Sequence, residues 1–150
     1  MSASKTIKFI KEKEIEYLDL RFTDPRGKLQ HLTMDGKMVD EKMLNEGVFF
    51  DGSSIAGWKA INESDMILKP DTERHIIDPF TSHNTLILFC DVLDAVKKDP
   101  YERDPRSIAK KAETYLKKTG IGDKAYFGPE AEFFVFDDVK FKNDMNDTGF

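Results

Sequence analysis

Two glutamates, Glu130 and Glu132, are separated by a single residue within the aromatic segment 127–136. Alternate side chains of a β-strand point to the same face, so this spacing would place both carboxylates on one side of a strand. Two acids are costly to bury among aromatic rings unless a cation or a base pairs with them. A site for Mg²⁺ or Mn²⁺, which prefer oxygen ligands and keep waters that a phosphate can replace, is one interpretation. The alternative, which the spacing alone favours, is an exposed acidic face of an edge strand.

A second candidate is the sequence Asp-Gly-Ser-Ser at residues 51–54. It combines an acid and two hydroxyls with a glycine that lets a loop approach a ligand or another chain closely. Asp51 could hold an ammonium ion or another cation, and a serine hydroxyl could bind a phosphate or a carboxylate. The alternative is an ordinary Asx or Ser/Thr turn, which the motif taken alone favours. Neither candidate decides the function by itself.

The remaining reactive residue types give weaker signals. His31, His75 and His83 lie far apart in the sequence and lack the spacing of metal ligands. Cys90, the single cysteine, follows an apolar run, which predicts a buried thiol in a reducing compartment rather than a disulfide. Trp58 is typical of a core or an interface. The sequence contains no glycine-rich phosphate loop, so a phosphate substrate would be held mainly by metal and by other residues.

The composition is that of an ordinary soluble domain. The chain has 150 residues, of which 39% are hydrophobic and 34% charged, and this excludes disorder and a collagen-like structure. A net charge of −5 argues against a nucleic-acid partner. Lysine doublets at 97–98, 110–111 and 117–118 indicate solvated faces. Charges interrupt every apolar stretch near the N-terminus, so we expect no signal peptide, no membrane span and a cytoplasmic protein.

The elements that must position these residues begin with short helices and strands. Ser4 is expected to cap a helix that carries Ile7 and Ile10. Strands at 15–22 and 28–34, joined by a turn at 24–27, predict a β-hairpin. Asp40 can cap a short helix that ends near Gly47, and an apolar strand at 48–50 then enters the Asp51 loop.

Three further strands are expected at 66–70, 76–80 and 85–92, followed by a linker at 96–101. This pattern favours a small α+β sheet domain. Asp104 as the N-cap, Pro105 at the first helical position and Gly120 past the end bracket a helix. A last strand is predicted over 125–139, which would carry the two glutamates, and residues 142–150 are expected to be irregular.

Taken in order, several strings closely resemble the N-terminal part of the bacterial type I glutamine synthetase family, from about Ile7 to about Lys142. They are Asp-Leu-Arg-Phe-Thr-Asp at 19–24, Phe-Asp-Gly-Ser-Ser-Ile at 50–55 with Gly57 and Trp58, Asn-Glu-Ser-Asp at 62–65, Arg-Asp-Pro-Arg at 103–106, and Gly-Pro-Glu-Ala-Glu-Phe-Phe at 128–134. The strings around Asp51 and around the two glutamates are highly specific in combination.

The resemblance implies an ATP-dependent ligase that joins glutamate and ammonia through γ-glutamyl phosphate, with two or three Mg²⁺ or Mn²⁺ ions per site. Glu130 and Glu132 would be metal ligands, one for the ion that polarises the γ-phosphate and one for the ion that holds glutamate. Asp51 would bind ammonium and help to remove its proton, with Ser54 nearby. The Asp51 loop would act across a subunit interface.

The resemblance also implies the architecture. Residues 1–103 would form a β-grasp domain, and residues 104–150 would be the incomplete start of the catalytic α/β half-barrel domain. Members of the family are ring homo-oligomers, and a dodecamer of two hexameric rings is expected. The nucleotide pocket, the glutamate-binding arginines and further metal ligands of the family lie beyond Phe150, so no nucleotide-binding residue is assigned here.

We therefore expect the 150-residue chain to be a truncated piece of such an enzyme and inactive alone. Two other functions stay open. One is a non-catalytic ring-interface or regulatory module formed by residues 1–103. The other is a related ligase of the same fold that joins glutamate to a larger amine, although the acid of the Asp51 loop favours ammonia, because an acid suits a small cation.

Overall fold

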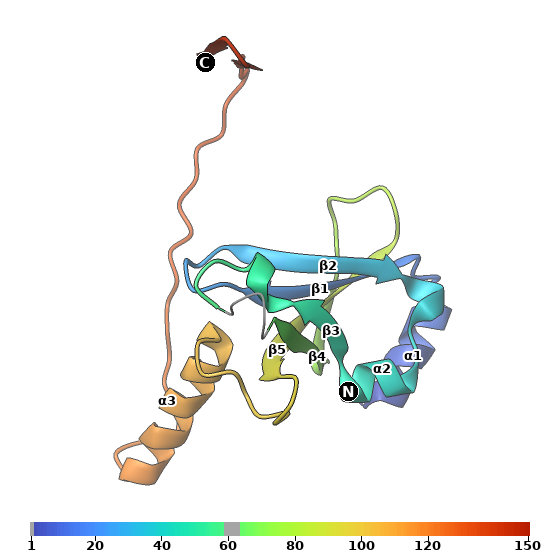
Figure 1. Cartoon of the computed structure of the whole chain (residues 1–150), viewed down its shortest axis with the longest axis vertical. Coiled ribbons are helices and arrows are strands. Elements are labelled where there is room, and N and C mark those ends of the chain that lie inside the picture. The colour runs from blue at the N-terminus through green and yellow to red at the C-terminus, as the bar shows by residue number, and fades with distance from the viewer. Residues whose placement is uncertain (1, 59–63) are drawn as a thin grey trace.

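The sheet at the centre of the molecule has five strands, as a computed structural model of residues 2–58 and 64–150 shows (Figure 1). Asn62 and Glu63, which belong to the family resemblance, lie outside the described residues. The strand order is β2-β1-β5-β4-β3. The bounds are β1 (Tyr17–Thr23), β2 (Leu29–Asp35), β3 (Val48–Asp51), β4 (Asp65–Ile77) and β5 (Thr85–Asp94).

The sheet is mixed because its central strand, β5, pairs differently on its two sides. It runs parallel to β1, with Tyr17 opposite Thr85, and antiparallel to β4. The other two pairs, β1 with β2 and β3 with β4, are antiparallel. The predicted α+β class is confirmed.

The β1–β2 turn forms as predicted, because Asp24 organises it. Its carboxylate accepts hydrogen bonds from the backbone N–H groups of Arg26 and Lys28, both at 2.9 Å. Gly27 adopts a φ of +82°, a left-handed conformation that glycine tolerates best. The sequence Asp-Pro-Arg-Gly therefore fixes the register of the hairpin.

A buried carboxylate, Asp19, joins the two strands of this hairpin. It accepts hydrogen bonds from Arg21 Nε at 2.7 Å and Thr33 Oγ1 at 2.7 Å, and it lies 2.8 Å from His31 Nδ1. Arg21 also donates to Asp78 at 2.8 Å. Burial raises the pKa of Asp19, but the hydrogen bonds from His31, Arg21 and Thr33 outweigh it, so its pKa lies below the usual range. The buried charge is thus paired, as its cost requires.

Two helices precede and interrupt the strands. Helix α1 (Ala3–Glu12) is capped by Ser2, whose side chain accepts from the backbone N–H of Lys5, so the prediction that Ser4 caps it was wrong. Ser4 lies inside the first turn instead. Helix α2 (Glu41–Glu46) was predicted correctly, with Asp40 accepting from the N–H of Met43 at 2.7 Å.

The strands predicted at 66–70 and 76–80 are one strand, β4 (Asp65–Ile77), and that part of the prediction was wrong. The pairing of β4 with β5 shifts register between Pro70 and His75. Pro70 has no N–H to donate, and a bulge of this kind lets a strand continue past such a break. Residues 78–80 lie in the loop that follows.

The core lies where α1 and α2 pack on the sheet, and its fully buried side chains come mainly from the central strands. They include Leu18, Leu20, Leu44, Leu68, Leu86, Leu88 and Val92. Cys90 is buried among them as predicted, and burial raises the pKa of its thiol. Within the described ranges, no helix is long and apolar enough to cross a membrane.

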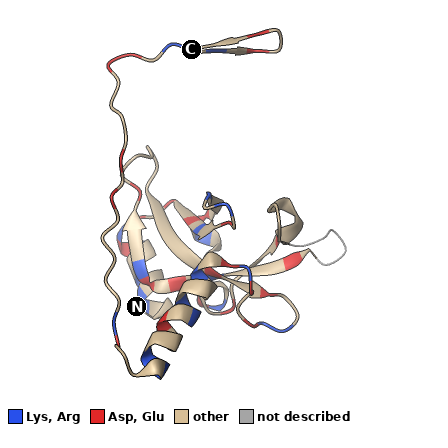
Figure 2. Cartoon of the chain, turned by 90° about the vertical axis from the view of Figure 1, so that its left-hand side faces the viewer, with Lys and Arg blue, Asp and Glu red and all other residues tan. Residues whose placement is uncertain are grey.

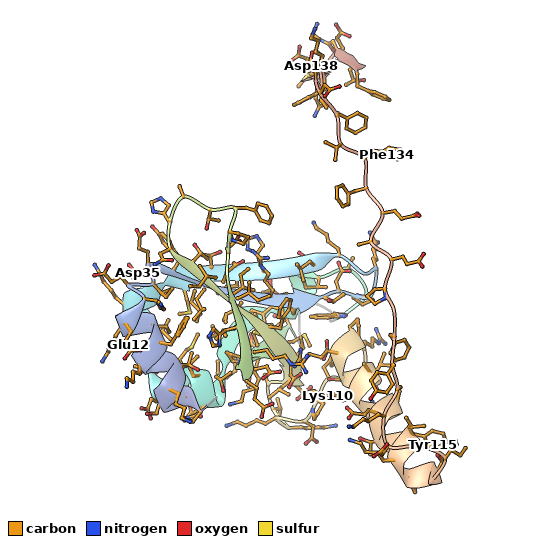
Figure 3. All side chains as sticks on the ribbon, turned by 180° about the vertical axis from the view of Figure 1, so that it is seen from behind. Glu12, Asp35, Lys110, Tyr115, Phe134 and Asp138 are labelled. Atoms are coloured by element: carbon orange, nitrogen blue, oxygen red, sulfur yellow. The ribbon has the colours of Figure 1, made fainter. Side chains whose placement is uncertain are left out.

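The C-terminal third begins with helix α3 (Pro105–Thr119), which has the predicted Asp104 cap and Gly120 at its end. The strand predicted over 125–139 is absent: this segment is exposed, has no strand partner and runs away from the sheet (Figures 1 and 3). Residues 142–150, expected to be irregular, instead contain a hairpin of β6 (Lys142–Asp144) and β7 (Asp147–Gly149). A strand needs a neighbour for its backbone hydrogen bonds, and residues 125–139 have none here.

Candidate functional site

Asp51 stands at the last position of β3, opposite Asp65 of β4. The 3₁₀ turn Gly52–Ser54 follows at once and folds back onto the acid. The Asp51 carboxylate accepts from Ser53 N at 2.8 Å, from Ser53 Oγ at 2.6 Å and from Ser54 Oγ at 3.3 Å. The Asx turn is therefore present, and it leaves Asp51 exposed.

The position of Gly52 is fixed by close packing. A Cβ at this residue would lie 2.3 Å from Met66 Sδ, so any other residue would force the buried Met66 side chain to move. Because the turn is held in this way, it directs the Asp51 carboxylate and the Ser54 hydroxyl into solvent. A ligand or another chain could reach both groups.

The hydrogen bonds from Ser53 hold the pKa of Asp51 below its usual range. We expect Ser53→Ala to raise the pKa of Asp51 toward its ordinary value, because the 2.6 Å hydroxyl contact is lost. A ¹³C NMR titration of the aspartate carboxylates would measure it. Ser54→Ala should raise the pKa less, since its contact is 3.3 Å long. An unchanged pKa in Ser53→Ala would contradict this role of the hydroxyl.

An aromatic cluster supports the far end of the loop. Trp58 is buried and lies 5.6 Å from Phe22, 6.2 Å from Phe50 and 5.7 Å from Tyr101, measured between ring centroids. The Tyr101 hydroxyl donates to the Trp58 carbonyl at 3.0 Å, and Arg103 donates to the Gly57 carbonyl at 2.9 Å. Tyr101 was predicted to be a linker residue, and its contact with the loop was not predicted. Tyr101 lies 43 residues from Trp58 in the sequence, so no local pattern pointed to this contact.

We expect Tyr101→Phe to lower the free energy of unfolding by about 0.5 to 1.5 kcal/mol, the usual net value of one hydrogen bond. The ring is retained, so the aromatic packing stays, while the hydrogen bond from the hydroxyl to the Trp58 carbonyl is lost. Urea unfolding would measure the change. Tyr115→Phe is the matched control, because Tyr115 is 70% exposed. Equal effects of the two substitutions would contradict the assignment.

The two glutamates are not gathered into a site. Glu130 and Glu132 are exposed on the extended segment, and no hydrogen bond or ion pair of the described residues joins them to the Asp51 loop. In the part of the chain that the structure describes, no three His, Cys, Asp or Glu side chains are grouped closely enough to hold a metal ion. Two carboxylates are the right kind of donor for Mg²⁺, but they fill only part of an octahedral shell.

The mixed sheet, the two short helices packed on it and the exposed acidic loop define an α+β domain of the β-grasp class. The family model for the β-grasp domain of glutamine synthetase matches residues 14–95, and the model for the catalytic domain of glutamine synthetase matches residues 102–150. The chain belongs to the glutamine synthetase family.

Individual relatives agree. The glutamine synthetases of Rhizobium meliloti and Azorhizobium caulinodans are 61% and 62% identical over 149 residues, which is 99% of this chain and 32% of each relative. The chain thus spans about a third of the length of these relatives. A glutamine synthetase structure from Plasmodium falciparum has a TM-score of 0.72 at 24% identity. The match covers 80% of this chain and 23% of the Plasmodium chain. That likeness supports the fold alone.

Proposed function

We propose that this sequence contributes to an ATP-dependent ligase that forms glutamine from glutamate and ammonia through γ-glutamyl phosphate. The observation that carries the proposal is the match of both family models, in order, over residues 14–95 and 102–150. The exposed, charged Asp51 on a rigid turn is consistent with it. A carboxylate with a lowered pKa stays negative at neutral pH and attracts an ammonium ion.

In this proposal Asp51 binds ammonium and helps to remove its proton, and Ser54 lies beside it as a hydrogen-bonding group. Glu130 and Glu132 contribute carboxylate ligands to the two or three Mg²⁺ or Mn²⁺ ions. Such ions, when bound, neutralise charge on the transferring phosphoryl group of ATP. The described part of the chain supplies too few ligands for such a centre, so other residues must complete it.

We further propose that residues 1–103 act as the β-grasp unit and residues 104–150 as the start of the catalytic domain. The Asp51 loop then completes the site of a neighbouring subunit in a cytoplasmic ring homo-oligomer, for which a dodecamer is expected. The loop is exposed, as an intersubunit role requires. On this proposal the 150 residues alone form no glutamine.

The experiment that tests the function uses the protein expressed from its native gene. Asp51→Asn should raise the KM for ammonia by about 10-fold or more, because one charge contact with ammonium is lost. The affinity for Mn²⁺ should change little. Asp65→Asn is the matched control, since Asp65 is exposed and pairs with Asp51 across the strands.

Four results would overturn parts of the proposal. An unchanged KM for ammonia in Asp51→Asn would remove Asp51 from the ammonium site. If the protein uses larger amines in preference to ammonia, it is a related ligase. The intact mass of the native gene product could also correspond to a chain that ends near Phe150. If that protein forms no glutamine, the result would favour a non-catalytic interface or regulatory module. Glutamine formation by the 150 residues alone would refute their predicted inactivity.

A further inference from the structure

Helix α3 is strongly basic in an otherwise acidic chain. Five of its residues are basic and one, Glu113, is acidic, whereas the whole chain has a net charge of −5 (Figure 2). A concentration of one charge sign on a helix creates a local potential that attracts ions of the opposite sign.

Three of the basic side chains have acidic partners. Arg106 pairs with Asp71 and, at 2.7 Å, with Asp91. Lys110 pairs with Asp91 at 2.5 Å, and Lys117 pairs with Glu113 at 2.8 Å. Lys111 and Lys118 have no hydrogen-bond or ion-pair partner among the residues that the structure describes. These two ammonium groups are available to an external anion.

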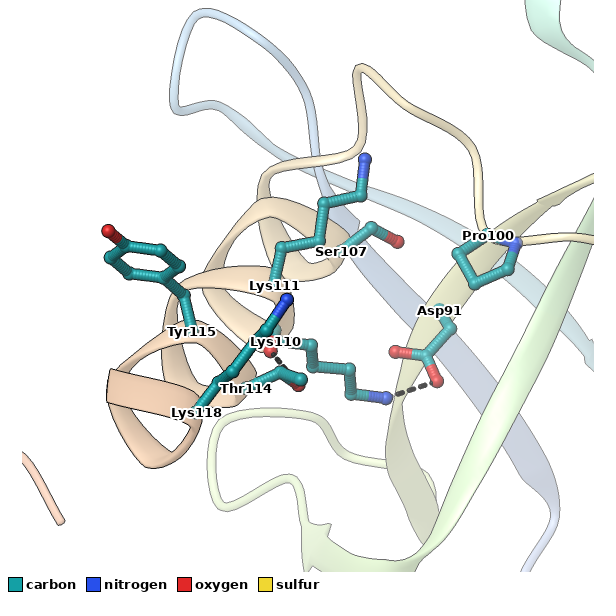
Figure 4. Close-up of a pocket in the computed structure, with 8 residues that line it drawn as sticks. All are labelled: Asp91, Pro100, Ser107, Lys110, Lys111, Thr114, Tyr115 and Lys118. Carbon is teal, nitrogen blue, oxygen red and sulfur yellow. Dashed lines mark hydrogen bonds and ion pairs between the residues drawn. The ribbon is translucent and has the colours of Figure 1, made fainter. Parts of the chain in front are cut away.

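Lys111 and Lys118 border a cavity of about 370 Å³ between α3 and the end of the sheet domain (Figure 4). They are seven residues apart, which is close to two helical turns, so they lie on the same face of α3. The Lys118 side chain runs back along the helix toward Lys111, while Lys110 crosses to Asp91. The two unpaired cations therefore belong to one cavity.

The rest of the cavity favours an anion with an apolar part. Asp91 lies in its wall, but Arg106 and Lys110 bind the two oxygens of its carboxylate, so its charge is compensated. Pro100 and Tyr115 add apolar and aromatic surface. A volume of this size falls within the range of small-molecule sites.

We propose that this cavity binds a small organic dianion, of which a phosphate monoester with an apolar group is the best-fitting class. The dianion would lie between the ammonium groups of Lys111 and Lys118, and its apolar group would pack near Pro100. The proposal does not depend on ligase activity. It revises the interpretation of the lysine doublets at 110–111 and 117–118 as solvated faces, for one member of each doublet.

Phenyl phosphate is the probe that tests the proposal. Titration into the ¹⁵N-labelled 150-residue chain at low ionic strength should shift the amide resonances of α3 and of the Asp91 region saturably. Inorganic phosphate should bind about 5-fold more weakly, because it lacks the buried ring. The double variant Lys111→Gln, Lys118→Gln should weaken phenyl phosphate binding by about 10-fold, since two partly exposed charge contacts are lost.

Lys117→Gln is the matched control, because Lys117 is on the same helix but is paired with Glu113. It should leave the affinity unchanged, and 0.5 M NaCl should weaken binding to the unsubstituted chain. Circular dichroism would establish that each variant is folded. Absence of saturation, equal affinity for inorganic phosphate, or an equal loss in Lys117→Gln would overturn the proposal. Shifts confined to residues outside α3 and the Asp91 region would also do so.

Discussion

Glutamine formation by the protein from the native gene should fall by about 10 to 100-fold or more in Glu130→Ala, and Mn²⁺ or Mg²⁺ binding should weaken in parallel. Even residues that only orient metal ligands have effects of this size when they are removed, and a direct ligand should have at least as much. The reason is that a neutral methyl group cannot replace the carboxylate that coordinates the ion. Metal titrations of the activity would measure both changes, and Glu132→Ala should behave alike.

Glu102→Ala is the control for a general effect of removing an acid, because Glu102 is exposed and lies outside the two proposed sites. Glu130→Gln separates charge from shape, since it keeps the size of the side chain. If metal dependence is unchanged in Glu130→Ala, the residue is not a metal ligand, and the alternative interpretation of an exposed acidic face holds. If Asp51→Asn has the same effect on metal affinity, the two motifs do not have separate roles.

Leu88→Ala should lower the free energy of unfolding by about 2 to 5 kcal/mol, the range for emptying a leucine-sized space in a core. Leu88 has 0% exposure in the central strand, opposite Leu20 of β1 and His75 of β4. The substitution would leave a cavity beside the central strand, next to the neighbouring strands on both sides. Since the total free energy of unfolding of a domain is about 5 to 15 kcal/mol, this substitution removes a large share of its stability. Urea unfolding followed by circular dichroism would measure it.

Leu29→Ala is the matched control, because the same atoms are removed from a side chain that is 47% exposed on the edge strand β2. It should cost well under half as much. Where Leu88→Ala fails to fold, Leu88→Val keeps the test possible and should fall between the two. Equal midpoints for the Leu29 and Leu88 variants would show that β5 is not the centre of the core.

The elements predicted correctly are those whose causes are local. Asp24 and Gly27 define a turn by hydrogen bonding and a left-handed φ, and Asp40 and Asp104 cap helices through their own side chains. These interactions span only a few residues, so both partners can be recognised within one short stretch of the sequence. Ser2 and Ser4 are equivalent in type, so the sequence did not distinguish them, and in the structure Ser2 is the cap while Ala3 and Thr6 are buried.

Other errors came from partners distant in the sequence. Pro70 indicates a strand end, yet β4 continues because β5 pairs with it on both sides of the register shift. Residues 125–139 have strand-like composition, but no neighbouring strand satisfies their backbone. Whether a segment pairs depends on what lies beside it, which periodicity does not reveal.

The candidate site divides in the same way. The Asp51 turn is local, and both interpretations of it are compatible, because the Asx turn itself presents the exposed acid. The contacts of Tyr101 and Arg103 with the loop span more than forty residues and gave no motif to find. The grouping of Glu130 with Glu132 stays a prediction, since a metal site depends on ligands that come together only in three dimensions.

The parallel pairing of β1 with β5 has a consequence for synthesis on the ribosome. The centre of the sheet can form only after Thr85, the partner of Tyr17, has been synthesised. At about 5 to 20 residues per second, that interval is roughly 3 to 14 s. The β1–β2 hairpin can form early, but one side of β1 then carries an open edge, with Leu18 and Leu20 uncovered. The nascent chain is thus most vulnerable to aggregation, and most in need of a chaperone, between the emergence of its second strand and that of its fifth.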